Sequence, residues 1–323
     1  MNDLSHWDAV IDFTAEQAAA LAVGKVSDLF CDKLTFTIDY KHPVERAWVS
    51  DRMKEFCSQK LQVKQHPGQR YKHRVFVYQG AYPSTMQMLI EYEPKASGLS
   101  YVRIDFNPAH CDMDAVKALL LSVLPGGLDD LPVRAKVTRI DLSVDLIGVH
   151  IDSLLLAFPG MQVSQVHCKS GLTETLYLGG YEGAKHVVVY DKVQEVKHLN
   201  ATKHLKKQLP ADPTTRIEIR LRPECGLAQL ADMENQFKKL ILSSWATAPK
   251  QDNLTWKLFI ALAQCRGLHD ALLMIDDKPL RKKYREQVAG ASPHWWKGDS
   301  IWEGWPKVLT EVFMLNASTV TPA

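Results

Sequence analysis

The sequence predicts an α+β protein with a mostly antiparallel sheet, flanking helices and a helical C-terminal region. Eight segments before Pro223 alternate apolar and polar residues, which is the pattern of half-buried strands. After Pro223 the apolar residues recur at helical spacing instead. The chain has 323 residues, of which 46% are hydrophobic, and this composition supplies enough apolar surface for a substantial core.

The elements are expected in a definite order along the chain. A helical lead occupies residues 1–30, where Thr14 and Gln17 form a capping-box pattern before an Ala/Leu-rich run. A sheet domain covers residues 31–222, and a helical region covers residues 223–323. Strands are predicted at 34–40, 74–79, 86–92, 101–107, 137–146, 175–178, 186–192 and 215–221, and helices at 113–123, 151–158, 227–245, 254–264, 268–274 and 279–289.

Composition excludes several classes of protein. A hydrophobic content of 46% with a net charge of only +2 excludes a disordered chain. No apolar run approaches the roughly 18 residues that a membrane-spanning helix needs, and MNDLSHWDAV at the start lacks the pattern of a secretory leader. The six cysteines are widely spaced and predict neither a zinc knuckle nor a disulfide framework. We therefore expect a cytoplasmic protein without a membrane partner.

The basic residues are unevenly distributed. Residues 51–74 hold seven Lys or Arg against two acids, and residues 185–222 hold nine against four. KPLRKKYR, at residues 278–285, has five basic residues, a tyrosine and no acid. Such local excess is typical of surfaces that bind phosphate, although solvated helix faces have the same composition. The near-neutral total therefore does not exclude a nucleic-acid partner.

The strand alternation places charged residues on one face of several strands. Arg-hydrophobe-acid triplets occur at 103–105, 139–141 and 216–218. A sheet face that is simply solvated is one explanation of these rows. The other is a site in which the acids hold a hard cation such as Mg²⁺ or Mn²⁺ and the arginines hold phosphate. The triplets favour the second explanation.

Tyr190 ends a predicted strand, with Lys192 on its own face and Glu195 just beyond. A phenol is a weak nucleophile until a cation or a base helps to remove its proton. Beside carboxylates and a divalent cation it can attack a phosphodiester. The spacing alone leaves open the alternative of a tyrosine packed in a strand for structural reasons.

Three segments in order carry a resemblance to a known family. They are RIDLSVD at 139–145, TLYLGGYEGAKHVVVYDKVQE at 175–195 and RIEIRL at 216–221. The set resembles the replication initiation factor family, the rolling-circle replication proteins of plasmids and some phages. It is more distantly similar to the gene-II-type replication endonucleases of filamentous phages, in which a Tyr-x-Lys-x-x-Glu-like segment precedes an Arg-x-Glu strand. The resemblance covers residues 34–221 in element order.

The resemblance implies an initiator of rolling-circle DNA replication that nicks and rejoins one strand of an origin through a 5′-phosphotyrosine intermediate, in a nicking domain at 31–222. It assigns Tyr190 as the nucleophile, Lys192 to phosphate or phenolate charge, and Glu195 to the same motif. The candidate ligands for Mg²⁺ or Mn²⁺ are Asp141, Glu218 and Asp145. The residues assigned to DNA are Arg74, Arg103, Arg139, Arg216 and Arg220. Expected partners are duplex and single-stranded origin DNA, a host helicase and a second copy of the chain, in the cytoplasm of a prokaryotic cell.

Two alternative functions stay open at this point. One is a non-enzymatic origin-binding protein in which Tyr190 is structural, and the other is a mobilisation relaxase with the same tyrosine chemistry. Acids clustered beside arginines favour metal-dependent cleavage over simple DNA binding. No His-x-His pair occurs in the sequence, so we expect a carboxylate-based site and not a histidine-based one.

Overall fold

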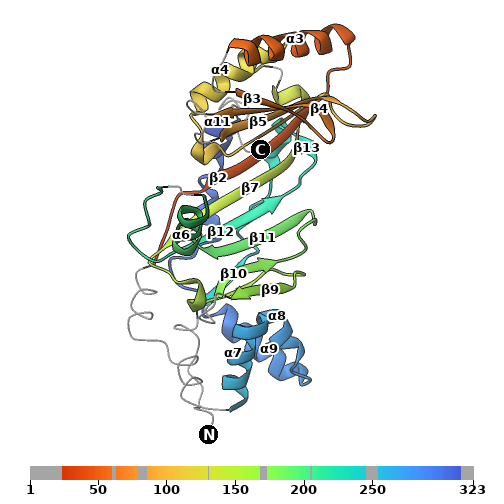
Figure 1. The fold of residues 1–323 in the computed structure, drawn as a ribbon. Helices are drawn as coiled ribbons and strands as arrows, with labels where there is room; N and C mark the ends of the chain where they lie inside the picture. The colour runs from red at the N-terminus through yellow and green to blue at the C-terminus, as the bar shows by residue number, and fades with distance from the viewer. Residues whose placement is uncertain are drawn as a thin grey trace. The chain divides into compact units, whose positions relative to one another are not determined.

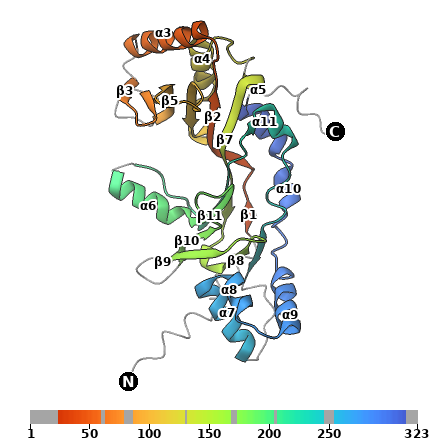
Figure 2. The same cartoon turned by 90° about the vertical axis from the view of Figure 1, so that its right-hand side faces the viewer.

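The computed structural model describes most of the chain (Figures 1 and 2). The described residues are 24–59, 63–78, 86–129, 131–167, 173–203, 206–244 and 254–313. Contacts within the chain define two compact units. Unit 1 comprises Met1–Asp28, Ser143–Ile219 and Asn235–Glu303, and unit 2 comprises Leu29–Leu142, Arg220–Glu234 and Gly304–Ala323. The strands β7 (Ala135–Ile147) and β12 (Thr214–Leu221) contribute residues to both units.

Unit 2 contains strands in the order β3-β4-β5-β6-β2-β7. They are β2 (Phe30–Ile38), β3 (Val63–Pro67), β4 (Tyr71–Tyr78), β5 (Met86–Pro94), β6 (Val102–Phe106) and the first part of β7, with which β13 (Cys225–Gly226) pairs. The antiparallel register aligns apolar residues in rows across the strands. Phe36 faces Ile104, and Ile104 faces Ile90 on its other side. All three are at most 2% exposed, so this row belongs to the core of unit 2.

The helices of unit 2 cover the apolar face of these strands. They are α3 (Pro43–Gln59), α4 (Met113–Val123), α5 (Leu131–Arg134) and α11 (Trp305–Phe313), with short 3-10 turns at Pro108–His110 and Ala228–Asp232. Figures 1 and 2 show α3 and α4 side by side against the strands. The Asp112 carboxylate accepts the backbone N–H groups of Asp114 and Ala115, which fixes the start of α4.

Unit 1 contains the strand order β12-β11-β10-β9 and a separate two-stranded sheet, β14-β8. The strands are β1 (Lys25–Val26), β8 (Leu154–Ala157), β9 (Val163–His167), β10 (Thr173–Leu178), β11 (Lys185–Asp191) and β14 (Ile241–Ser244), with parts of β7 and β12. β1 pairs with the end of β7, and β10 pairs with both β9 and β11, all antiparallel.

The helices of unit 1 are α6 (Lys192–Lys203), α7 (Leu254–Arg266), α8 (Leu268–Leu273), α9 (Lys278–Ala289) and α10 (Gly298–Trp302), with a 3-10 turn at Ile151–Ser153. We call α7, α8 and α9 the three-helix cluster, which lies beside β8 and β9 (Figure 1). Its centre is aromatic, because the rings of Trp256, Phe259 and Tyr284 lie with their centroids 4.8 to 5.4 Å apart. These rings and the apolar residues around them form a core of their own.

The predicted α+β class is confirmed. Each predicted strand is present within a few residues of its expected limits, and the predicted helices at 113–123, 254–264, 268–274 and 279–289 are present as α4, α7, α8 and α9. Among the described residues, none of the helices combines the length and the apolar character that crossing a bilayer requires. The predicted helix after Thr14 lies outside the described residues. The limits expected at residues 30 and 222 differ from those of the two units and, as domain limits, stay a prediction.

The helix predicted at 151–158 is wrong. Residues 151–153 form a 3-10 turn and residues 154–157 form β8, which pairs with β14. Leu154, Leu155 and Leu156 are all buried, so both faces of the strand are covered. A short apolar run without alternation is compatible with a buried strand or a buried helix, and tertiary contacts decide between them.

The helix predicted at 227–245 is also wrong, because the Asn235 side chain stabilises a non-helical backbone there. Only Ala228–Asp232 is helical, as a 3-10 turn, and β14 begins at Ile241. The Asn235 side chain accepts the backbone N–H groups of Phe237 and Lys238 and donates to the carbonyl oxygen of Gly298. These bonds offer the backbone an alternative to the helical pattern.

The sequence did not predict α3 or α6. Among the residues of α3, Val49 and Met53 are buried, whereas Val44 is 80% exposed, so its apolar pattern is weak. The start of α6 is defined by Asp191, whose carboxylate accepts the backbone N–H groups of Val193 and Gln194. A single capping residue at the end of a strand therefore converts the chain from strand to helix.

Replacing Asn235 tests its role in unit 1. Asn235→Ala removes the bonds to Phe237, Lys238 and Gly298, and we expect the free energy of unfolding to fall by on the order of 2 kcal/mol. Chemical denaturation followed by circular dichroism measures the change. Asn200→Ala is the control, because Asn200 bonds only across an exposed loop to Lys207. Equal losses in the two variants would show that Asn235 has no special structural role.

Candidate active site

β11 carries Tyr190 between two neighbouring strands. The tight turn that leads into β11 contains Gly179 at φ +82°, a left-handed conformation that favours glycine. β10 and β11 then pair in antiparallel register, with Thr175 opposite Tyr190. Val187, Val188 and Val189 are buried and anchor the strand. β10 and β11 therefore form a hairpin that leads to Tyr190.

Tyr190 is hydrogen-bonded to a carboxylate on the adjacent strand. Its hydroxyl donates to Glu218 Oε1 at 2.6 Å. Glu218 is buried, with 4% of its surface exposed, and Tyr190 is half-buried. Burial raises the pKa of Tyr190 well above its usual value, and the negative charge of Glu218 raises it further, while Arg216 acts in the opposite direction. The resting tyrosine is thus a protonated phenol held against a base.

An ion pair between β7 and β12 lies beside this contact. The Arg216 guanidinium donates to both carboxylate oxygens of Asp145, at 2.7 and 2.9 Å. The side chain of Arg216 is only 8% exposed, so the pair is largely buried. Gly148, directly after β7, donates its N–H to the carbonyl oxygen of Pro213, directly before β12. Gly148 is three residues after Asp145, and Pro213 is three residues before Arg216. These two contacts establish that the two strands run antiparallel in this part of unit 1.

The same register places Ser143 opposite Glu218. Ser143 lies two residues before Asp145, and Glu218 lies two residues after Arg216, so the two form the next cross-strand pair on the same face. The Ser143 side chain is fully buried, and its hydroxyl has no hydrogen-bond partner among the described residues. A polar group without a partner among the described residues therefore faces the carboxylate that accepts the hydrogen bond from Tyr190.

Lys192 and Glu195 form the first turn of α6, directly after the Tyr190 strand. The Lys192 ammonium is ion-paired with the Glu195 carboxylate, and it lies 5.7 Å from the centroid of the Tyr190 ring. The sequence motif thus becomes a strand end followed by a helix start, which brings all three side chains to one place. A cation near the phenol attracts negative charge, whether on the oxygen of Tyr190 or on an incoming phosphate.

The remaining predicted metal ligand, Asp141, belongs to unit 2. Arg139 donates to both of its oxygens, at 2.9 and 2.6 Å, and the Arg220 Nε lies 3.7 Å from Oδ2. Asp141 has a side chain that is 3% exposed, so it is a buried anion neutralised by two guanidinium groups. Any DNA phosphate that Arg139 or Arg220 binds must compete with this carboxylate.

Arg74 and Arg103 belong to a second charged network on unit 2. Arg103 donates to Glu91 at 2.6 Å and to Asp105 at 2.7 Å, and Arg74 lies 3.0 Å from Glu91. The acids here are 10 to 12% exposed, whereas the arginines are 28 and 38% exposed. The arginines of this network are therefore more exposed than its acids, and a phosphate-binding surface needs exposed cations of this kind.

Burial excludes a simply solvated sheet face as the explanation of the polar row in β7 and β12. Asp141, Ser143, Arg216 and Glu218 are all less than 9% exposed. A sheet face that is simply solvated does not bury such groups, because charges removed from water must be paired. In β7 and β12 the polar row is thus an internal network of specific contacts.

The donor set does not form a metal site in the described part of the chain. There, no group of three or more His, Cys, Asp or Glu side chains lies close enough together to hold a metal ion. Asp141 and Asp145 are engaged with arginines, and Glu218 accepts a hydrogen bond from the Tyr190 hydroxyl. The residues present do not fit a three-carboxylate Mg²⁺ or Mn²⁺ site, and the predicted cation stays a prediction.

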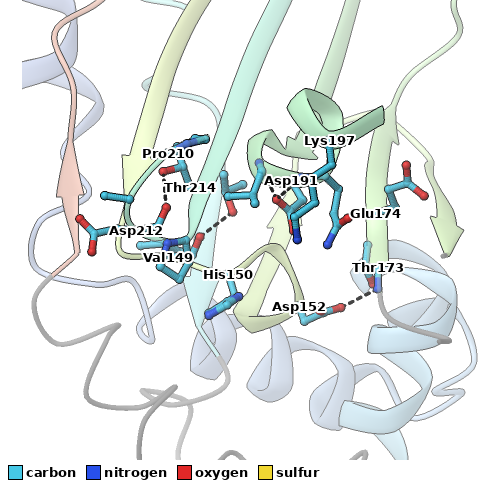
Figure 3. A pocket seen from close by; sticks show the side chains of 15 residues that line it. Val149, His150, Asp152, Thr173, Glu174, Asp191, Lys197, Pro210, Asp212 and Thr214 are labelled. Carbon is cyan, nitrogen blue, oxygen red and sulfur yellow. Dashed lines mark hydrogen bonds between the residues drawn. The ribbon is translucent and has the colours of Figure 1, made fainter. Parts of the chain in front are cut away.

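A cavity of about 350 Å³ adjoins the end of β11 (Figure 3). Its lining includes Asp191, which follows Tyr190 and caps α6, and Asp152, which accepts the Thr173 N–H at 2.6 Å. Burial raises the pKa of Asp152. The other charged residues of the lining are Glu174, Lys197 and Asp212, with His150 beside them. Four carboxyl groups against one lysine make this cavity unsuitable for a DNA phosphate.

Known proteins include structures with a distant similarity to this chain. The structure of a rolling-circle replication initiator protein from Geobacillus stearothermophilus aligns with 83% of this chain and 99% of its own, at 13% sequence identity and a TM-score of 0.38. No protein-family model matches the sequence, and no curated protein matches it. At this TM-score the similarity supports no inference about residues or activity.

The predicted site residues are divided between the two units. Unit 1 holds Tyr190, Lys192, Glu195, Asp145, Arg216 and Glu218, and unit 2 holds Asp141, Arg74, Arg103, Arg139 and Arg220. Sequence reasoning did not predict that Glu218 accepts the hydroxyl of Tyr190, nor that Ser143 faces Glu218. The alternation of RIDLSVD and RIEIRL gave the correct faces, but the register between the two strands is a tertiary feature that alternation does not contain.

Two buried strand hydroxyls of unit 1 provide a matched test of this network. Ser143 has no partner in the described structure, whereas Thr215 donates to the carbonyl oxygen of Val149 at 2.8 Å. We expect Ser143→Ala to leave the free energy of unfolding unchanged or raise it, and Thr215→Val to lower it by about 1 kcal/mol. Urea denaturation of both variants measures the difference. A large loss in Ser143→Ala would mean that its hydroxyl has a partner.

Titration tests the environment of Tyr190. Because its pKa is raised in the folded protein, Tyr190 contributes stability that is complete below about pH 10 and is lost as the pH rises toward the folded pKa. Phenolate absorbance of the native protein, with Tyr190→Phe as the blank, isolates its ionisation. Glu218→Gln removes the neighbouring charge and should shift ionisation to lower pH. An unchanged midpoint in Glu218→Gln would contradict the assigned contact.

Proposed function

We propose that the protein initiates rolling-circle DNA replication by cutting and rejoining one DNA strand through Tyr190. The observation that carries the proposal is the hydrogen bond from the Tyr190 hydroxyl to buried Glu218, because it joins a nucleophile to the base that takes its proton. The resemblance of the ordered segments 139–145, 175–195 and 216–221 supports the same function. The proposed substrate is origin DNA.

The proposed reaction is a transesterification at phosphorus. The Tyr190 Oη–P bond forms as the P–O3′ bond breaks, and the hydroxyl proton passes to the Glu218 carboxylate. The departing 3′ oxygen takes a proton from water and becomes a free 3′-OH. The products are a 5′-phosphotyrosine and a primer end for DNA synthesis. Attack of a 3′-OH on the phosphotyrosine reverses the step, with Glu218 returning its proton to Tyr190.

The raised pKa of Tyr190 determines when its hydroxyl proton can leave. A carboxylate is a far weaker base than a phenolate, so the proton leaves unfavourably until Oη begins to bond to phosphorus. The nucleophile is therefore inactive in the absence of a bound phosphodiester. Lys192 lies close enough to stabilise the negative charge that develops on the phosphate, and Glu195 holds that ammonium in place.

The described side chains do not fit a three-carboxylate site for the predicted Mg²⁺ or Mn²⁺. The dependence of DNA cleavage on this cation is therefore left to measurement. A host helicase and a second copy of the chain are further partners that the sequence resemblance implies. The arginines of unit 2 are proposed to contact the DNA backbone, led by Arg74, whose side chain is 38% exposed.

Nicking of a supercoiled plasmid that carries the cognate origin tests the proposal. With Mg²⁺ or Mn²⁺ present we expect an open circle with protein attached to the 5′ end. Tyr190→Phe should retain DNA binding and form no adduct. Glu218→Gln should slow cleavage by about 10² to 10⁴, the range of a lost general base. Denaturing gels of the DNA–protein adduct measure all three.

Each outcome of this experiment has a definite meaning. An adduct formed by Tyr190→Phe would exclude Tyr190 as the nucleophile. Origin binding without any adduct in the unaltered protein would instead favour the non-enzymatic initiator. Cleavage that persists after chelation with EDTA would exclude the predicted dependence on a cation. Asp191→Asn is the control for Glu218→Gln, because Asp191 is a neighbouring carboxylate that caps α6 and has no part in the proton transfer.

A further inference from the structure

The three-helix cluster contains two helices joined by a short and well-defined turn. α8 ends at Leu273, and α9 begins at Lys278. The Asp277 carboxylate accepts the Leu280 N–H and so caps α9. The Arg281 guanidinium donates to the carbonyl oxygen of Ile275 through Nε, at 2.8 Å, and also through Nη2. These bonds fix the turn that precedes α9.

α9 has an apolar face and a basic face. Tyr284 and Val288 are buried in the three-helix cluster. Lys278, Lys282 and Arg285 are exposed and are spaced i, i+4 and i+7, so they fall within roughly a 60° arc of the helix surface. The two buried residues are centred about 110° around the helix from these three side chains. The arrangement leaves a straight cationic stripe on the accessible side of the helix.

We propose that α9 docks in the major groove of duplex DNA through this basic stripe. The proposal rests on the proposed function in that it takes origin DNA as the partner, but it concerns binding and not cleavage. The width of the major groove admits one α-helix, and the second helix of a helix-turn-helix enters it with side chains from its exposed face. Lysine and arginine on that face bind phosphates and the acceptor edges of guanine.

The acids near the stripe do not neutralise its positive charge. Glu286 lies on α9, with Oε1 3.9 Å from the Lys282 Nζ, and both side chains are well exposed. Asp277 is occupied by its capping bond, and Asp276 lies in the turn before the helix. α9 itself carries five basic residues and one acid. This excess complements the charge of a DNA duplex, which has one phosphate about every 1.7 Å of its axis.

Duplex binding by a neutralised stripe tests the proposal. The variant Lys278→Gln/Lys282→Gln/Arg285→Gln should bind a fluorescein-labelled duplex of roughly 21 base pairs at least tenfold more weakly than the unaltered protein. The slope of log K against log salt should become shallower by up to about 2.7, because each lost phosphate contact removes about 0.9. Fluorescence anisotropy over a salt series measures both quantities.

A second triple variant separates this surface from general charge. Lys25, Lys238 and Lys297 are exposed lysines elsewhere in unit 1, and their replacement by glutamine removes the same charge. We expect this control to retain most of the duplex affinity. Equal losses in the two variants would overturn the proposal, as would an unchanged affinity in the α9 variant. Circular dichroism of both variants verifies that the three-helix cluster is folded.

Cleavage of a single-stranded origin oligonucleotide distinguishes this proposal from the proposed function. The α9 variant should form the Tyr190 adduct on single strands at the unaltered rate, because the stripe has no part in the chemistry. Loss of duplex binding with cleavage retained supports docking by α9. If the unaltered protein cleaves nothing but its duplex affinity still depends on the stripe, the proposed function fails and the docking surface stands. An α9 variant that also loses single-strand cleavage would contradict a separate docking role.

Discussion

The hydrogen bond between Tyr190 and Glu218 is the contact on which the arrangement of the candidate site depends. It requires that β11 and β12 are neighbours and that both side chains lie on one face. Alternation in each strand provides the face, and pairing of the strands provides the proximity. Burial then makes the contact costly to break, because an unpaired carboxylate in this position would lose a hydrogen bond without gaining water.

Charge pairing explains how so many ionisable groups are tolerated inside the two units. Asp145 is bound bidentately by Arg216, and Asp141 by Arg139. Planar guanidinium groups match carboxylates in geometry and lose little when they form both bonds at once. The arginines that resemble phosphate ligands in the sequence are therefore partly committed to structure. The more exposed arginines of unit 2, and the basic stripe of α9, remain accessible to DNA.

Local pattern predicted the fold class and most elements, and it failed where tertiary contacts decide. α4 has a capping aspartate and helical spacing, and its limits were predicted correctly. The Leu154–Ala157 segment is buried on both faces, so its sequence contains no alternation to distinguish a strand from a helix. In the site, the tyrosine motif predicted a strand that ends near Tyr190, but the contact between Tyr190 and Glu218 depends on a register that the sequence leaves free.

The separation of cleavage from duplex binding follows from these contacts. Glu218 and Ser143 lie in paired strands whose register is fixed by buried residues, so the tyrosine site has little freedom to adjust to sequence. The basic face of α9 is exposed and makes few contacts, so its side chains can change without disturbing the core of the three-helix cluster. The proposed function requires chemistry that stays constant while the origin sequence varies. Rigid strands for the reaction and an accessible helix for the duplex satisfy both requirements within unit 1.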